Sequence, residues 1–267
     1  MWFPTPEQIA AGAKAAQGIY NALSEGLVSE LIDRVRHGRP TFMVFGPGGT
    51  GKSTLKRVLE TLSENDLNHE YVMSAIWEGG GINGRRFADV KVFPGQKDFR
   101  DGQIENHRQW FRGIRRPFIV LCCSYGYRAV DARYPFSRNA PQANDAARQE
   151  ELTYVDEILS RIRILCGFPK YKILLMILKQ DLWWEEEKDV REFYETKYVP
   201  IITKFAEQSV GMPNVTYDIF PMCLIRSNLR DVNGNIIKNG SGLYDEEKRR
   251  EHTVFFLHSL GNMLRGS

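Results

Sequence analysis

The residues of this chain that are best suited to chemistry form a glycine-rich run ending in a lysine and a hydroxyl side chain. The run reads G-P-G-G-T-G-K-S over residues 46–53, a spacing at which successive backbone N–H groups can surround phosphate oxygens. Lys52 would reach the β- and γ-phosphates of a nucleoside triphosphate, and the Ser53 hydroxyl would ligate Mg²⁺. The residues expected to bind nucleotide here are Gly46, Gly48, Gly49, Thr50, Gly51, Lys52, Ser53 and Thr54. The alternative interpretation is a glycine-rich turn that binds nothing.

A second segment that could do chemistry is an apolar run ending in charged residues, L-K-Q-D-L at residues 178–182. A carboxylate can accept two parallel hydrogen bonds from the N1–H and N2–H₂ groups of guanine, whereas adenine offers no such pair of donors. Asp181 is therefore a candidate for selecting guanine. In the alternative interpretation, Asp181 only caps the start of a helix.

Both segments follow apolar runs that have the character of buried strands. The expected strands cover residues 41–45, 71–77, 86–93, 117–124, 171–178 and 215–222. The expected helices cover residues 7–37, 53–63, 150–166, 188–210 and 245–264. Glycine-rich residues 79–84 are expected to form the turn of a hairpin. Strands that alternate with helices predict a three-layer α/β fold, with a mostly parallel sheet and one antiparallel edge strand. Ligands of such sheets bind at the carboxyl ends of the strands, where both segments lie.

With these segments in this order, the chain resembles the Ras-like small GTPases, a superfamily of P-loop GTPases, and within it the Arf-type branch. In that family the strand before the base-binding loop ends in N-K-x-D, and residues 178–181 read L-K-Q-D. The resemblance implies that Lys179 and Asp181 bind guanine, with the aliphatic stem of Lys179 over the base plane. Leu178 departs from the pattern because it lacks the side-chain amide that braces the loop in the family.

The segment V-F-P-G-Q at residues 92–96 stands where the family has D-x-x-G-Q. Gly95 matches the residue whose N–H senses the γ-phosphate, and Gln96 matches the catalytic glutamine that orients the attacking water. Val92 stands where the family has an aspartate that holds Mg²⁺ through water. Asp89 cannot simply replace that aspartate, because it points to the other face of the strand and lies about 10 Å back along it.

Two further positions of the family pattern are weak in this sequence. Residues 64–70, where the first switch region should fall, contain no threonine to bind Mg²⁺. The last base-contacting loop should follow the strand at residues 215–222, and Cys223 with Leu224 is the positional match. The degenerate switch motifs predict hydrolysis that is slow, dependent on a partner or lost.

Two long segments, residues 125–149 and 226–244, depart from a minimal small GTPase. Each is either a partner-binding insertion or a solvated surface loop. In the second segment, residues 231–235 have the composition of a turn between two short strands.

The bulk composition fits one large α/β domain with an appendage. We expect an N-terminal helical extension over residues 1–38 and a GTPase-like G domain over residues 39–267. The net charge of +3 gives no reason to propose nucleic acid as a partner. The four cysteines lack metal-ligand spacing and are expected to be buried, reduced thiols: Cys122, Cys123, Cys166 and Cys223. No stretch approaches the roughly 18 apolar residues of a membrane span.

The sequence therefore predicts a cytoplasmic GTP-binding protein that acts as a switch, with Mg²⁺ as cofactor and a protein effector or regulator as partner. A nucleotide-binding scaffold without turnover is one alternative. Another is an ATPase or kinase of the same P-loop class, in which Arg128, Arg133 and Arg138 would form a lid. The N-terminal helix is expected to pack within the chain or against another protein, and docking on a membrane surface is its alternative role.

Overall fold

The fold of this chain was analysed in a computed structural model. The structure describes residues 40–61, 78–81, 89–93, 95, 114, 116–128, 145–165, 170–209, 214–230 and 235–265. The expected helix at residues 7–37, the strand at residues 71–77 and the catalytic candidate Gln96 lie outside the described residues. The proposed domain boundary after residue 38 lies outside them too, and it stays a prediction.

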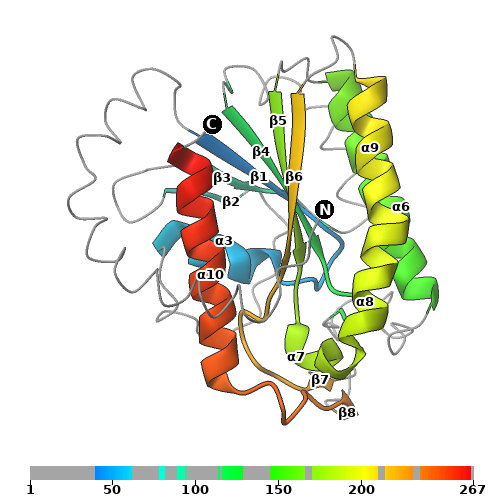
Figure 1. Ribbon diagram of the computed structural model, residues 1–267, viewed down its shortest axis with the longest axis vertical. Coiled ribbons are helices and arrows are strands. Elements are labelled where there is room, and N and C mark those ends of the chain that lie inside the picture. Colours follow the sequence, from blue (N-terminus) through cyan, green and yellow to red (C-terminus); the bar gives the residue numbers. More distant parts are fainter. Residues whose placement is uncertain are drawn as a thin grey trace.

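The centre of the molecule is a six-stranded sheet in the order β2-β3-β1-β4-β5-β6. Its strands are β1 (Pro40–Phe45), β2 (Glu78–Gly81), β3 (Asp89–Val92), β4 (Arg116–Cys123), β5 (Lys170–Ile177) and β6 (Asn214–Pro221). Strands β3, β1, β4, β5 and β6 run parallel to one another, and β2 pairs antiparallel with β3 at the edge. The predicted α/β fold with one antiparallel edge strand is therefore confirmed (Figure 1).

The glycine-rich segment before β3 corrects one expectation. Gly79, Gly80 and Gly81 were expected in a turn, but they lie in strand β2, where they pair with Lys91, Val90 and Asp89. Pairing is possible because a glycine keeps the backbone N–H and C=O groups that a strand needs, although it has no side chain to pack. An antiparallel partner of β3 exists, but it is formed by residues 78–81 and not by the expected strand at residues 71–77.

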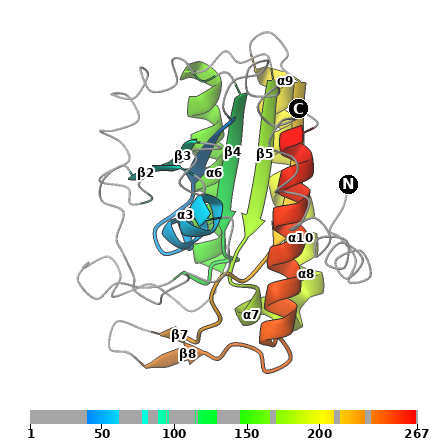
Figure 2. The same ribbon diagram turned by 90° about the vertical axis from the view of Figure 1, so that its left-hand side faces the viewer.

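Helices cover both faces of the sheet, as Figures 1 and 2 show. Helices α3 (Lys52–Thr61) and α10 (Glu246–Arg265) lie on one face, where Leu55, Val58, Phe256 and Leu260 share a buried cluster with strand residues. The other face is covered by α6 (Asp145–Leu165), α8 (Glu187–Phe193), the π-helical turn η4 (Tyr194–Tyr198) and α9 (Val199–Gln208). Helix α6 begins at Asp145 and not near residue 150, so the end of the expected 125–149 insertion is helical.

Smaller elements lie at the carboxyl ends of the strands. Helix α7 (Gln180–Trp183) and the 3-10 turn η3 (Trp184–Glu186) follow β5. The short strands β7 (Leu229–Arg230) and β8 (Ile236–Lys238) pair antiparallel. This pair confirms the predicted short strands, and residues 231–234 between them lie outside the described residues.

Two other expectations concern cysteines and membrane spans. Cys122, Cys123 and Cys223 are free and buried, as expected, and Cys166 lies outside the described residues. In the described part of the chain, no helix combines the length and apolar character needed to cross a bilayer.

Candidate nucleotide-binding site

The glycine-rich run forms the loop between β1 and α3, at the carboxyl end of the central strand. This loop approaches the end of β4 so closely that a Cβ on Gly46 would lie 2.4 Å from the carbonyl oxygen of Cys122. Gly46 also has a φ of 156°, a backbone conformation that residues with side chains rarely adopt. The hydroxyl of Thr50 donates to the carbonyl of Pro47 at 3.0 Å, which braces the turn from within.

The ammonium group of Lys52 lies inside this loop. Its Nζ donates to the carbonyl oxygens of Gly46 at 2.7 Å and Pro47 at 2.8 Å. The side chain is 5% exposed. Burial lowers the pKa of Lys52 to about 8, and the nearby charge of Arg128 acts in the same direction. At neutral pH the group is still mostly protonated, so it can stabilise negative charge at the mouth of the loop.

Ser53 and Thr54 lie in the first turn of α3 and are partly buried. The described residues contain no group of three or more His, Cys, Asp or Glu side chains that could hold a metal ion. The Ser53 hydroxyl fits an Mg²⁺ ion that takes its other ligands from phosphate and water, as this ion commonly does. Val92 is fully buried, and Asp89 lies on the opposite, half-buried face of β3.

Gly95 lies directly against the glycine-rich loop of residues 46–53, named here the phosphate loop. A Cβ at this position would be 2.4 Å from the carbonyl oxygen of Gly46, 2.5 Å from Nζ of Lys52 and 2.6 Å from the backbone nitrogen of Gly48. The approach is set by Phe93, whose N–H donates to Val44 at 2.9 Å. The structure therefore brings the end of β3 to the phosphate loop. The role of Gly95 toward the γ-phosphate stays a prediction.

Leu178 connects the loop after β5 to the phosphate loop through an apolar contact. Its Cδ1 would lie 3.2 Å from a Cβ on Gly51. Its N–H donates to Cys123 at 2.7 Å, and its carbonyl accepts the indole N–H of Trp183 at 2.9 Å. Leu178 thus lies against the phosphate loop by packing, without the amide that the family pattern has at this position.

Lys179 has a left-handed backbone, with φ 59° and ψ 42°. This conformation is uncommon for a residue with a side chain, and such residues cluster at functional sites. Burial lowers the pKa of Lys179 to about 7, while the nearby carboxylates of Glu151 and Asp181 raise it. Lys179 is therefore held at a strained position between two acidic groups.

The carboxylate of Asp181 is engaged on both oxygens. Its Oδ1 accepts the thiol of Cys223 at 3.2 Å, and its Oδ2 accepts the backbone N–H of Ser227 at 2.9 Å. Helix α7 has no side-chain cap, so the alternative interpretation of Asp181 as a helix cap is wrong. Asp181 is 2% exposed, and burial raises its pKa although the Ser227 and Cys223 hydrogen bonds oppose that rise.

Cys223 and Leu224 follow β6, as expected from the sequence. The structure brings Cys223 to Asp181, whereas the side chain of Leu224 packs into the core between the sheet and α10. The carbonyl of Leu224 accepts a hydrogen bond from Arg249 at 3.3 Å. Only the first of these two residues therefore has its side chain at the candidate base site.

Sequence reasoning missed a buried carboxylate beside the site. Glu151 of α6 is fully buried and accepts two hydrogen bonds from Ser124, one from the backbone N–H at 3.2 Å and one from the hydroxyl at 2.8 Å. Burial raises the pKa of Glu151. Its neighbour Glu150 is exposed and pairs with Arg128 at 2.5 Å. Helical periodicity is the signal that could have found Glu151, because it lies four, seven and eleven residues before the buried Val155, Ile158 and Ile162, whereas Glu150 does not share that face.

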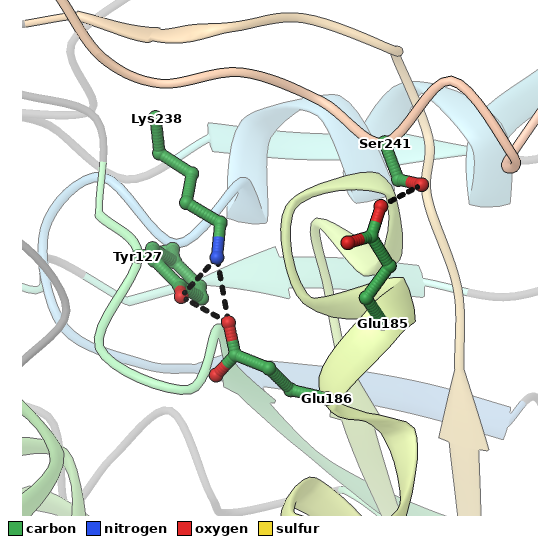
Figure 3. Close-up of polar contacts among 5 residues, drawn as sticks. All are labelled: Tyr127, Glu185, Glu186, Lys238 and Ser241. Carbon is green, nitrogen blue, oxygen red and sulfur yellow. Dashed lines mark hydrogen bonds and ion pairs between the residues drawn. The ribbon is translucent and has the colours of Figure 1, made fainter.

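The segment around β7 and β8 also contributes unexpected contacts. Lys238 donates to Oε1 of Glu186 at 2.6 Å and to the hydroxyl of Tyr127 at 3.1 Å, and that hydroxyl donates to Glu186 at 2.9 Å (Figure 3). Burial alone would raise the pKa of Glu186, but hydrogen bonds from Lys238 and Tyr127 lower it. The 226–244 segment is therefore attached to the loops after β4 and β5 through Lys238. Most of its described residues are nevertheless exposed, as the surface-loop interpretation expects.

Comparison with known proteins assigns no family to this chain. No family model matches this chain. No curated protein matches it either. The crystal structure of S. thermophilus NFeoB bound to GDP·AlF4⁻ is 12% identical with a TM-score of 0.35, and the match covers 80% of this chain and 63% of that chain. The mammalian SRP receptor is 14% identical with a TM-score of 0.42, covering 70% of this chain and 92% of that chain.

The class of fold follows from the molecule itself. The chain spans less than two thirds of the length of the NFeoB chain that it matches. The strand order and the glycine-rich loop between β1 and α3 define a three-layer α/β fold of the P-loop type.

Proposed function

We propose that this chain binds GTP and GDP and acts as a nucleotide-dependent switch that hydrolyses GTP slowly or only with a partner. The observation that carries the proposal is the approach of Gly95 to Lys52 and Gly48 of the phosphate loop. A segment that touches the phosphate loop from the end of β3 is suited to respond to the γ-phosphate, since a change in charge there alters its contacts.

The candidate residues then divide into those that hold the phosphates, one that also holds the metal, and two that respond to the γ-phosphate. The residues of the loop and of the first helical turn hold the phosphates: Gly46, Gly48, Gly49, Thr50, Gly51, Lys52, Ser53 and Thr54. Ser53 also ligates Mg²⁺, whose charge would offset that of the phosphates. Gly95 senses the γ-phosphate, and Gln96 orients the attacking water.

The base is assigned to the loops after β5 and β6. Asp181 accepts the two guanine donors, the stem of Lys179 covers the base plane, and the backbone at Cys223 and Leu224 approaches the guanine oxygen. The hydrogen bond from Cys223 to Asp181 supports this assignment, because it orients the carboxylate. The Arf-type relationship suggested by residues 179–182 belongs to the proposal, as do a cytoplasmic location and a protein effector or regulator.

A nucleotide-binding scaffold without turnover is the second candidate. It is favoured by Val92, which is fully buried in the core at the position where the family has a carboxylate for Mg²⁺. A site that binds Mg²⁺ through one serine and the nucleotide would support binding more readily than rapid hydrolysis.

Two measurements test the proposal. Nucleotide released from the purified protein should be identified by chromatography, and we expect GDP or GTP; ADP or ATP in that fraction would overturn the guanine assignment. Phosphate release from GTP is then measured for the wild type and Gln96→Leu. Turnover that is lost in Gln96→Leu supports the switch, whereas bound GTP that is never hydrolysed supports the scaffold.

A further inference from the structure

The described residues of the 226–244 segment, residues 226–230 and 235–244, lie over the carboxylate proposed to read guanine. We propose that this segment, named here the strap, must open for guanine to bind, and that Lys238, Glu186 and Tyr127 form the latch that holds it closed. The inference rests on the proposed function, because it assigns a regulator to the same base site.

The inner end of the strap is attached to Asp181 by two hydrogen bonds and approaches it closely at Gly240. Ser227 donates its backbone N–H to Oδ2 at 2.9 Å, and Ser241 donates its backbone N–H to the Asp181 carbonyl at 2.7 Å. A Cβ on Gly240 would lie 3.3 Å from Oδ2. The adjacent Tyr244 donates its hydroxyl to Gln180 at 3.2 Å. The strap thereby helps to bury the residue that would face the base.

The carboxylate of Asp181 is enclosed by the chain itself. Guanine presents N1–H and N2–H₂ to the two oxygens of one carboxylate. Here Cys223 and Ser227 each donate to one of those oxygens, and Asp181 is 2% exposed. Each oxygen could accept a second hydrogen bond, but the edge of Asp181 that guanine would meet is covered. The strap, whose Ser227 donates to Oδ2, must therefore move before the base can be read.

The outer end of the strap is held by Lys238 of β8, whose partners lie in the loop after β4 and in η3. Figure 3 shows Lys238 of β8 pointing at Glu186 and Tyr127, and Ser241 pointing at Glu185. Lys238 and Glu186 retain 37% and 31% of their side-chain exposure. An ion pair with this exposure is weak enough to break reversibly. A latch at the outer end and a covering contact at the inner end make two states of the strap possible.

Only molecules with an open strap should bind guanine nucleotides. The apparent affinity should therefore equal the affinity of the open state multiplied by the fraction of molecules that are open. Weakening the latch should consequently raise that affinity. Lys238→Met removes the charge but retains an apolar stem of similar length. Lys172→Met is the matched control, because Lys172 forms a 2.9 Å ion pair with Asp218 and is also partly exposed.

The test uses calorimetric titration of GDP into the full-length wild type and both variants. We expect Lys238→Met to bind GDP about two- to fivefold more tightly, because one partly exposed ion pair of the closed state is lost. Lys172→Met should bind like the wild type. Equal affinity in Lys238→Met and the wild type, or weaker binding in Lys238→Met, would overturn the proposal.

Hydrogen exchange distinguishes a failure of the strap from a failure of the proposed function. On addition of GDP, backbone exchange should slow at residues 46–54 and accelerate at residues 226–230, where the Ser227 hydrogen bond is given up. Slowing at residues 46–54 with no acceleration at residues 226–230 overturns the strap and leaves guanine binding intact. If GDP protects residues 46–54 in neither the wild type nor Lys238→Met, guanine binding itself is wrong, and the strap falls with it.

Discussion

Gly95 lies so close to Lys52 that a methyl group on its α-carbon would be 2.5 Å from Nζ, and the carbonyl oxygen of Gly46 would be closer still at 2.4 Å. The contact with Gly46 could not be relieved by the movement of a flexible side chain, because it would involve a backbone carbonyl oxygen. Either the end of β3 or the phosphate loop must therefore shift when any side chain is introduced at Gly95.

We accordingly predict that Gly95→Ala weakens nucleotide binding at least about tenfold, or about 1.4 kcal/mol. Titration calorimetry measures the loss. Lys204→Ala is the control, since Lys204 is an exposed residue of α9 outside the candidate site and the strap. An affinity for Gly95→Ala equal to that of the control would show that this close approach does not matter for binding.

The adjacent residues Glu150 and Glu151 give a second prediction, about stability. Glutamine at position 151 has one acceptor oxygen in place of two, so one of the two Ser124 donors should lose its partner in the interior. We expect Glu151→Gln to lower the free energy of unfolding by about 1–3 kcal/mol. Glu150→Gln removes only the surface ion pair with Arg128, so the free energy of unfolding should change by less than about 1 kcal/mol. Urea denaturation of both variants compares the two losses; equal losses would contradict the buried role of Glu151.

A third prediction concerns acid stability and His252 of α10. This side chain is 7% exposed, and burial lowers its pKa to about 4, although the hydrogen bond to the carbonyl of Pro221 opposes the shift. In the unfolded chain a histidine takes up its proton near pH 6.5. Between pH 6.5 and pH 4 the unfolded state therefore binds more protons, so stability falls as the pH is lowered through this window.

The size of the effect follows from the difference between the two pKa values, and amounts to about 3 kcal/mol. Between pH 7 and pH 4, the free energy of unfolding should fall by about 3 kcal/mol less in His252→Gln than in the wild type. The half-buried His258 of the same helix provides the control variant, His258→Gln. Parallel pH profiles for the wild type and His252→Gln would exclude His252 as the cause.

Much of the fold could be predicted because its signals are local. Apolar runs ended by glycine or charge located β1, β4, β5 and β6, and the glycine-rich spacing located the turn before α3. The strand at Glu78–Gly81 could not be predicted from composition, because its pairing with β3 is made by backbone groups that glycine shares with every residue other than proline.

The candidate site was predicted only where a motif carries it. Gly95 and Lys52 could be recognised because each belongs to a short sequence motif. The structure brings the two residues together. Ser227 has no motif, and its contact with Asp181 uses a backbone N–H, 46 residues along the chain. Leu178 breaks the family pattern, yet it still contacts the phosphate loop, since packing against Gly51 requires only an apolar side chain.

The central claim is that the loop around Lys52 binds a guanine nucleotide. Titration calorimetry of GDP and ADP, each with Mg²⁺, into the wild type, Lys52→Ala and the surface control Lys204→Ala tests it most directly. The account predicts that GDP binds the wild type and Lys204→Ala, that ADP binds either protein more weakly, and that Lys52→Ala binds neither nucleotide. Unchanged GDP affinity in Lys52→Ala, or a preference of the wild type for ADP, would contradict it.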